Sequence, residues 1–269
     1  MDGETLNGGV NQVVRIGRTV RRPTGAWTPA VHSLLRHLAE TGFTGAPRVR
    51  GIDEEGREIL DFVPGEVAHY PIPEYVRGDV ALAAAGRLLR RYHDASAGFT
   101  APDGAVWQLP AREPREVVCH GDAATYNTVF RVGLPVALID FDAAHPGPRV
   151  WDLAYTAYRF APLGAPGSNG EHVPVAEQAR RLRLLADAYG LGPADRRALP
   201  RTVCDRLHAL VAFMTERAAA GDTAFARHLA DGHDALYRTD AAHVRAHEER
   251  FAEALLSGAS TEPPPAAAT

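Results

Sequence analysis

The chain contains no lysine, so all 29 of its basic residues counted as Lys+Arg are arginine. Its two cysteines are too few for a disulfide framework, and neither lies in a CxxC or Cys/His pattern, so we expect Cys119 and Cys204 to be core thiols. No zinc-type histidine spacing occurs. The net charge of −4 gives no basic field for nucleic acid. No apolar run approaches the roughly 20 residues that span a bilayer, so we expect neither a nucleic-acid nor a membrane partner.

What the chain has is a composition suited to a sizeable core, with 45% apolar residues among 269. The start of the chain shows no charged leader followed by an apolar stretch. We therefore expect a cytoplasmic, enzyme-like protein that acts on a small molecule as a monomer or homodimer.

The hydrophobic pattern changes along the chain. Residues 1–63 alternate as strands do, around one helical segment that begins near Thr28 and ends at Gly42, which predicts a small antiparallel sheet with one helix. Residues 64–256 are mainly helical, and residues 257–269 form a low-complexity tail that we expect to be disordered. The pattern predicts an α+β protein with a sheet-based N-terminal lobe and a helical C-terminal lobe.

The stretch "VVCHGDAATYNTVF" contains His120, Asp122 and Asn127 in the pattern H-x-D-x-x-x-x-N, and a later apolar strand, "LPVALID", ends in Asp140. This stretch and the later strand flank a loop, as the two short strands of a hairpin do, and two strands side by side would place Asp122, Asn127 and Asp140 at one mouth. Carboxylate and carboxamide oxygens suit magnesium, which is commonly completed by nucleotide phosphates. Asp122 would then be free to accept a proton. Taken alone, the stretch also fits a polar hairpin loop.

The motif "CHGDAATYN" followed by "IDFDAAHPGPRVWDLA" resembles the aminoglycoside phosphotransferase family, whose relatives include choline kinases and, distantly, protein kinases. The resemblance covers ordered motifs from about Leu6 to Ala154. It implies a bilobal protein-kinase-like fold. It also implies transfer of the γ-phosphoryl group of ATP, with GTP not excluded, to a hydroxyl of an aminoglycoside or other antibiotic.

The resemblance implies a role for each motif residue. Asp122 would be the catalytic base, and Asn127 and Asp140 would hold the Mg²⁺ that bridges the nucleotide phosphates. His120 would brace the catalytic loop through hydrogen bonds, and Asp152 would support the same loop from the following helix.

Two upstream segments resemble nucleotide-binding parts of the family. "NGGVNQVVRI" corresponds to the loop that covers the phosphates, where Gly8, Gly9, Val10 and Asn11 would bring backbone amides close to the nucleotide. "ILDFVPGE" resembles the linker between the lobes. Its residues Asp61, Phe62 and Val63 would bind adenine, with the backbone of the first and third making the pairing.

The chain departs from the family at two places. Where relatives usually have a lysine, the strand offers only Arg21 and Arg22, and the motif register favours Arg21. Where relatives usually have a glutamate in the next helix, the chain has Val31 or His32, and no acid appears before Glu40. The ion pair that positions the phosphate-binding cation is therefore absent or comes from elsewhere.

The acceptor is the least determined feature. A polycationic acceptor needs carboxylates, and the candidate substrate residues are Asp142, His145, Glu177 and Glu216, although a solvated helix face would contain the same acids. Related folds also phosphorylate choline, homoserine and sugars. The two departures leave open a pseudokinase, a nucleotide-binding or scaffold protein without turnover, while the retained motif acids favour an enzyme.

Overall fold

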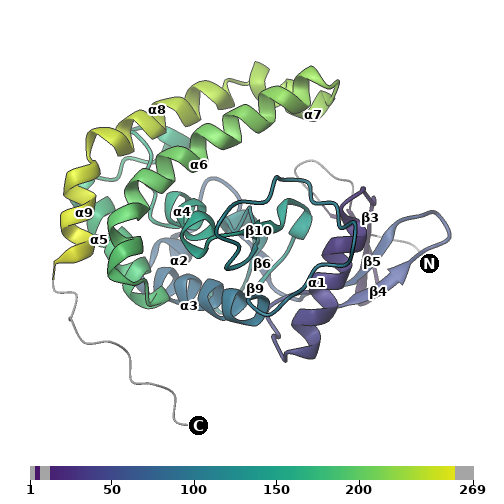
Figure 1. The fold of residues 1–269 in the computed structure, drawn as a ribbon. Coiled ribbons are helices and arrows are strands. Elements are labelled where there is room, and N and C mark those ends of the chain that lie inside the picture. Colours follow the sequence, from purple (N-terminus) through teal and green to yellow (C-terminus); the bar gives the residue numbers. More distant parts are fainter. Residues whose placement is uncertain (1–3, 7–12, 258–269) are drawn as a thin grey trace, which may run out of the picture.

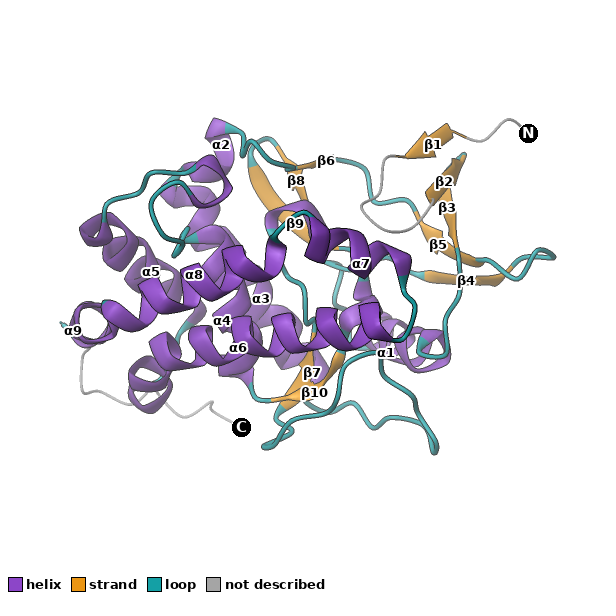
Figure 2. Cartoon of the chain, turned by 90° about the horizontal axis from the view of Figure 1, so that it is seen from above, coloured by secondary structure: helices purple, strands orange, loops and turns teal. Residues whose placement is uncertain are grey.

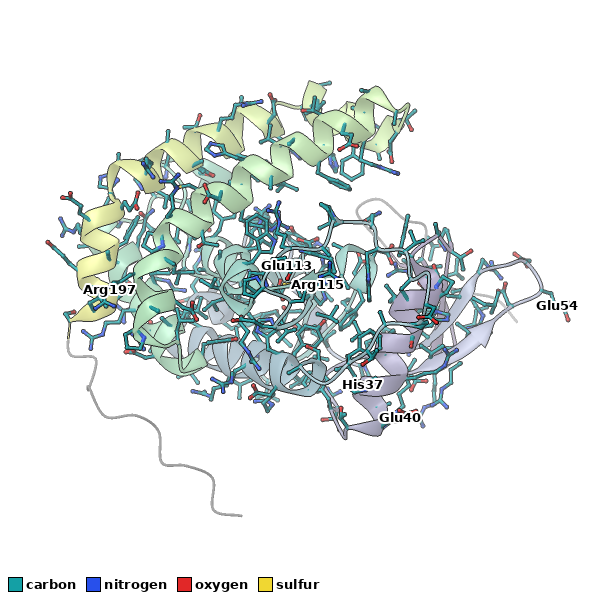
Figure 3. All side chains as sticks on the ribbon, viewed as in Figure 1. His37, Glu40, Glu54, Glu113, Arg115 and Arg197 are labelled. Atoms are coloured by element: carbon teal, nitrogen blue, oxygen red, sulfur yellow. The ribbon has the colours of Figure 1, made fainter. Side chains whose placement is uncertain are left out.

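The computed structural model describes residues 4–6 and 13–257. Its N-terminal part is a five-stranded antiparallel sheet in the order β1-β2-β3-β5-β4, with helix α1 packed on it (Figure 1). The strands and helix are β1 (Glu4–Leu6), β2 (Val13–Ile16), β3 (Thr19–Arg22), α1 (Thr28–Glu40), β4 (Val49–Ile52) and β5 (Glu58–Asp61). Glu54 lies at the tip of the β4–β5 turn, which extends away from the helices (Figure 3). The sequence pattern predicted this sheet and its single helix.

Helix α1 forms where the sequence places apolar residues on one face. Pro29 lies in its first turn, where the missing amide costs nothing, and Leu34, Leu35 and Leu38 are almost fully buried. The helix ends at Thr41, before Gly42, whose φ of +81° suits a helix end. This buried face connects the sheet to the main core of the molecule.

Most of the remaining chain is helical, and long helices pack side by side at one end of the molecule (Figure 2). The helices are α2 (Glu74–Arg77), α3 (Asp79–Ser96), α4 (Arg149–Phe160), α5 (Val175–Tyr189), α6 (Pro193–Ala219), α7 (Thr223–Ala230), α8 (His233–Ala246) and α9 (Glu248–Leu256). Helix α6 packs along both α4 and α8, and α3 packs along α5. The helical spacing of apolar Leu182, Leu185, Leu207 and Val211 predicted this helical part, and all four residues are buried.

Two small antiparallel sheets lie between these parts: β6-β8-β9 and β7-β10. Their strands are β6 (Glu66–Val67), β7 (Val117–Cys119), β8 (Thr128–Arg131), β9 (Leu134–Leu138) and β10 (His145–Gly147). The expected hairpin forms between the end of the stretch 117–130 and the strand that leads to Asp140. Strand β9 pairs with β8, which precedes it by a two-residue turn at Val132 and Gly133, and β7 pairs with β10. The short turn brings β8 and β9 together locally.

The architecture is α+β, as the sequence predicted. In the part of the chain that the structure describes, no helix combines the length and apolar character needed to cross a membrane. The predicted disordered tail falls, apart from Ser257, outside the described residues.

Candidate active site

The predicted catalytic loop follows β7 directly. Gly121 has a φ of +81°, and a Cβ at this position would collide with the carbonyl oxygen of Ala143. The His120 ring is fully buried; its Nε2 donates to the carbonyl oxygen of Ile139 at 3.0 Å, and its Nδ1 accepts from the Asp122 amide at 3.3 Å. Burial lowers the pKa of His120, which favours this neutral form. These bonds place the His120 ring between the loop and the strand that ends near Asp140, which is the geometry expected of a brace.

Asp152, near the start of α4, lies behind the same loop. Its carboxylate accepts hydrogen bonds from the amides of His120 and Gly121 at 2.6 and 2.9 Å, and from His93 Nε2 at 2.9 Å. Although burial alone would raise it, the hydrogen bond and charge of His93 bring the pKa of Asp152 to about 2. The buried carboxylate is therefore ionised, and it fixes the loop backbone. His93 also bonds to the Tyr189 hydroxyl at 2.7 Å, so it links α3, α4 and α5.

The Asp122 carboxylate is held on both oxygens. Tyr126 donates its hydroxyl to Oδ1 at 2.9 Å, and Asn127 donates its Nδ2 to Oδ2 at 2.8 Å. Burial raises the pKa of Asp122 to about 6. A fixed carboxylate with this proton affinity is suited to accept a proton near neutral pH.

The β8–β9 hairpin brings Asn127 and Asp140 to one end. Asn127 precedes β8, Asp140 follows β9, and the Ile139 amide donates to the Asn127 carbonyl at 2.9 Å. Asp140 has a φ of +63°, a strained value for a residue with a side chain, and such strain concentrates at functional sites. Its carboxylate is 43% exposed.

The donor set at Asn127 and Asp140 fits a divalent cation. Asn127 donates a hydrogen bond from its Nδ2 to Asp122, which leaves its side-chain oxygen available to bind a cation. Asp140 offers a hard carboxylate, which already pairs with the Arg22 guanidinium. Among the described residues, no cluster of three or more His, Cys, Asp and Glu forms a metal site. The side-chain oxygens of Asn127 and Asp140 would supply two ligands, so nucleotide phosphates would have to complete the coordination shell of a magnesium ion.

The motif register favoured Arg21 as the phosphate-binding cation, but the structure places Arg22 at this site. The Arg22 guanidinium contacts Asp140 at 3.0 Å, Glu58 at 2.7 Å and also Asp142. Although burial disfavours its charge, these three carboxylates raise the pKa of Arg22 above its ordinary value. Arg21 faces the other way, towards Thr19 and Asp53. Successive residues of a strand point to opposite faces, so the one-residue choice of register decides which arginine enters the site.

The acid that α1 lacks comes from β5. Glu58 lies directly opposite Arg22 in the β3–β5 pair, and its other carboxylate oxygen is 2.7 Å from His32 Nε2 of α1. Glu58 and His32 are buried. The helix is thus linked to the arginine through a glutamate on a strand, in place of a glutamate of its own.

The nucleotide-binding residues are placed only in part. Gly8, Gly9, Val10 and Asn11 lie outside the described residues. In the linker between the two parts of the molecule, the amide of Asp61 donates to the Arg48 carbonyl and that of Phe62 donates to the Arg18 carbonyl. An adenine contact at Asp61 would therefore use its carbonyl oxygen, and the role of Val63 stays a prediction.

The four candidate substrate residues are not brought together. Asp142 lies against Arg22, where burial raises the pKa of its carboxyl to about 6. His145 is buried in β10 and bonds to the Ala143 carbonyl, so it does not face an acceptor. Glu177 is engaged by Arg180 on the surface of α5, and Glu216 is exposed on α6. Sequence spacing could not show that these residues lie on different faces.

Several residues that the motif search missed surround Asp122. The Tyr126 hydroxyl lies 2.9 Å from that of Tyr155, and Arg159 donates to Tyr155 at 2.9 and 3.1 Å. Arg206 of α6 donates to the Gly121 carbonyl at 2.5 Å. The available signal was an arginine four residues after a tyrosine inside an otherwise apolar helix, "WDLAYTAYRF".

Comparisons with known proteins identify the family of this chain. A family model described as the phosphotransferase enzyme family matches residues 103–199, which include the catalytic loop and Asp140. A trifolitoxin immunity protein of Rhizobium leguminosarum bv. trifolii is 39% identical over 198 residues, which cover 70% of this chain and 74% of that protein. The chain belongs to the phosphotransferase enzyme family.

Solved structures share the fold at low sequence identity. A choline/ethanolamine kinase family protein from Mesorhizobium loti has a TM-score of 0.64 and 17% identity, covering 95% of this chain and 92% of that one. An amicoumacin kinase in complex with AMP-PNP, Ca²⁺ and Ami has a TM-score of 0.62 and 12% identity, covering 86% and 88%. The bilobal protein-kinase-like fold is confirmed; the lobe boundary after residue 63 stays a prediction.

Proposed function

We propose that this chain is an ATP-dependent O-phosphotransferase that phosphorylates a hydroxyl of a small molecule, an antibiotic or toxin-like compound. The main support is the Asp122 carboxylate, which is fixed by Tyr126 and Asn127 and has a pKa of about 6. In the proposed step, the acceptor oxygen forms a bond to the γ-phosphorus, its proton passes to Asp122, and the bond from the γ-phosphorus to the bridging oxygen breaks to release ADP.

Positioning and charge neutralisation provide most of the rate in such transfers. Asn127 and Asp140 would hold Mg²⁺, which would neutralise the phosphate oxygens when bound. Arg22 is held by Glu58 through its Nε, and its two terminal nitrogens, which face Asp140 and Asp142, would turn to phosphate when nucleotide binds. His120 and Asp152 keep the loop rigid around Asp122.

The antibiotic or toxin-like acceptor is supported by two similar proteins, a trifolitoxin immunity protein and an amicoumacin kinase. An aminoglycoside, which the family resemblance favours, needs gathered carboxylates, and the four predicted substrate residues do not supply them. Choline, homoserine and sugars remain acceptors to compare. The pseudokinase alternative loses part of its motivation, because Glu58 supplies the ion pair that α1 lacks.

The test is a panel of hydroxyl compounds incubated with Mg-ATP, with the mass of each product measured. The panel contains aminoglycosides, macrolides, peptide antibiotics, choline, homoserine and sugars. We expect one member to gain the mass of one phosphoryl group in a magnesium-dependent manner. Nucleotide binding without transfer to any member would favour the scaffold alternative.

A further inference from the structure

A narrow pocket opens beside the catalytic loop. Its wall contains Thr125 of that loop, Tyr158 and Arg159 of α4, and Tyr70 from the segment after β6. The long connection after α4 closes one side with Pro162, Gly164 and Ser168, among other residues. The pocket is thus bounded by the catalytic loop on one side, and by α4 and the connection that follows it on the other.

Arg159 is the main charged group of this pocket, and it is only 7% exposed. It donates to the hydroxyls of Tyr155 and Tyr237 at 2.8 to 3.1 Å, and its Nη1 is 3.5 Å from the Tyr70 hydroxyl. Its guanidinium also lies 4.8 Å from the centre of the Tyr158 ring. Among the described residues, no carboxylate forms an ion pair with it. Tyrosines solvate the cation without neutralising it, and a buried charge without a counter-ion is costly.

Two further arginines line the pocket, and each has a carboxylate partner. Arg77 is paired with Glu171 at 2.7 Å, and Arg181 lies 3.7 Å from Asp79. Within the described chain, the Thr125 hydroxyl is buried and has no hydrogen-bond partner. The wall therefore offers a bound anion two groups, the Arg159 charge and the Thr125 hydroxyl donor.

The same arginine is linked to the catalytic base. The Tyr126 hydroxyl bonds to Asp122 Oδ1 and to the Tyr155 hydroxyl, which in turn accepts from Arg159. The Arg159 charge also acts on Asp122, where it opposes the effect of burial on the pKa. A group bound at Arg159 would therefore lie one short hydrogen-bond chain from the carboxylate that accepts the proton.

We propose that this pocket binds the acceptor through a carboxylate, and that Arg159 is the residue that selects for it. The inference rests on the proposed phosphotransferase function and narrows its substrate class to hydroxyl compounds that bear an anionic group. Polycations such as aminoglycosides are rejected at this site, because they would bring positive charge to a buried guanidinium that has no ion pair among the described residues.

The first test compares matched ligands on the wild-type protein. The probes are N-acetyl-L-serine and N-acetyl-L-threonine, each against its primary amide, with binding measured by calorimetry with and without AMP-PNP and Mg²⁺. A charge-assisted hydrogen bond predicts that each acid binds about tenfold or more tightly than its amide. Equal binding of acid and amide, tighter binding of the amide, or no binding of either acid would overturn the proposal.

The second test measures how mutation of Arg159 changes the preference for the acid over the amide. Arg159→Gln should abolish the acid preference, and Arg159→Lys should retain part of it. Arg201→Gln removes the same charge from an exposed position of α6 and should leave the preference unchanged. A preference that persists in folded Arg159→Gln would overturn the role of Arg159. If Arg159→Gln fails to fold, Arg159→Lys and the wild-type ratio of acid to amide binding decide.

Turnover separates this inference from the proposed function. If the acids bind preferentially but none of them or the panel compounds is phosphorylated, transfer is refuted and the anion pocket stands. If acid and amide are phosphorylated with the same kcat/KM, transfer stands and the anion pocket is refuted.

Discussion

Asp122 is subject to opposing influences on its proton affinity. Burial raises its pKa, the positive charge of Arg159 lowers it, and the result is a pKa of about 6. A general base acts in its unprotonated form. We therefore expect kcat/KM for the acceptor to rise about tenfold per pH unit below pH 6 and to level off above it. A pH–rate profile measures this, and a flat profile between about pH 5 and 7 would contradict the assignment.

The Arg22–Glu58 pair makes a separate prediction about nucleotide binding. Glu58→Gln removes the charge that lies opposite Arg22 in the sheet, so the guanidinium should shift towards Asp140 and Asp142. We expect KM for ATP to rise about tenfold with a smaller change in kcat. Steady-state kinetics at varied ATP concentration measure it. The control is Glu40→Gln, at the exposed end of α1 (Figure 3), which should leave KM unchanged.

The lowered pKa of Asp152 predicts how the free energy of unfolding depends on pH. Its pKa in the folded protein is about 2, against an ordinary value of 3.8, so its ionised form favours folding. The contribution, about 2 kcal/mol, is present above about pH 4 and is lost as the pH falls towards 2.

The matching variant is Asp152→Asn, which leaves the loop amides and His93 with a weaker acceptor. The free energy of unfolding in urea at pH 7 should fall by about 3 kcal/mol. Asp94→Asn, on the exposed face of α3, is the matched control and should cost less than about 1 kcal/mol. Equal losses in the two variants would refute the bracing role of Asp152.

At the scale of elements, Asp240 of α8 holds the connection that lines the proposed pocket. It is fully buried and accepts hydrogen bonds from Tyr158 of α4, from the Ser168 hydroxyl and from the Ala165 amide. Asp240→Asn should therefore loosen this connection. We expect faster amide hydrogen exchange in residues 161–174 and a loss of about 2 kcal/mol of stability. Asp234→Asn, partly exposed in the first turn of the same helix, is the control; similar exchange in both variants would show that Asp240 does not hold the connection.

The elements that the sequence predicted well are those with a strong local signal. Helix α1 follows from Pro29, its leucine spacing and the glycine after it, and the alternation of β2 and β3 follows from their residues. The pairing of β7 was not predictable, because strands of three residues contain too little pattern to choose between partners. The choice between Arg21 and Arg22 failed for a related reason: a shift of one residue reverses the face of a strand.

At the scale of the whole molecule, the motif residues were predictable from their order along the chain, and their partners were not. Glu58 reaches Arg22 across β3 and β5, and Arg159 reaches the catalytic loop from α4. These contacts join residues that are far apart in sequence, and no motif relates their positions along the chain. The family could therefore be inferred from the sequence, while the arginines that line the proposed pocket could be found only from the fold.

The central claim is that Asp122 promotes phosphoryl transfer to a hydroxyl. The most direct measurement incubates wild-type protein and Asp122→Asn side by side with Mg-ATP and the acceptor that the panel identifies, and follows product mass while ATP binding is measured separately. The account predicts that the wild-type product gains one phosphoryl group, and that the variant binds ATP with unchanged affinity but forms no product. Wild-type turnover in Asp122→Asn would contradict it.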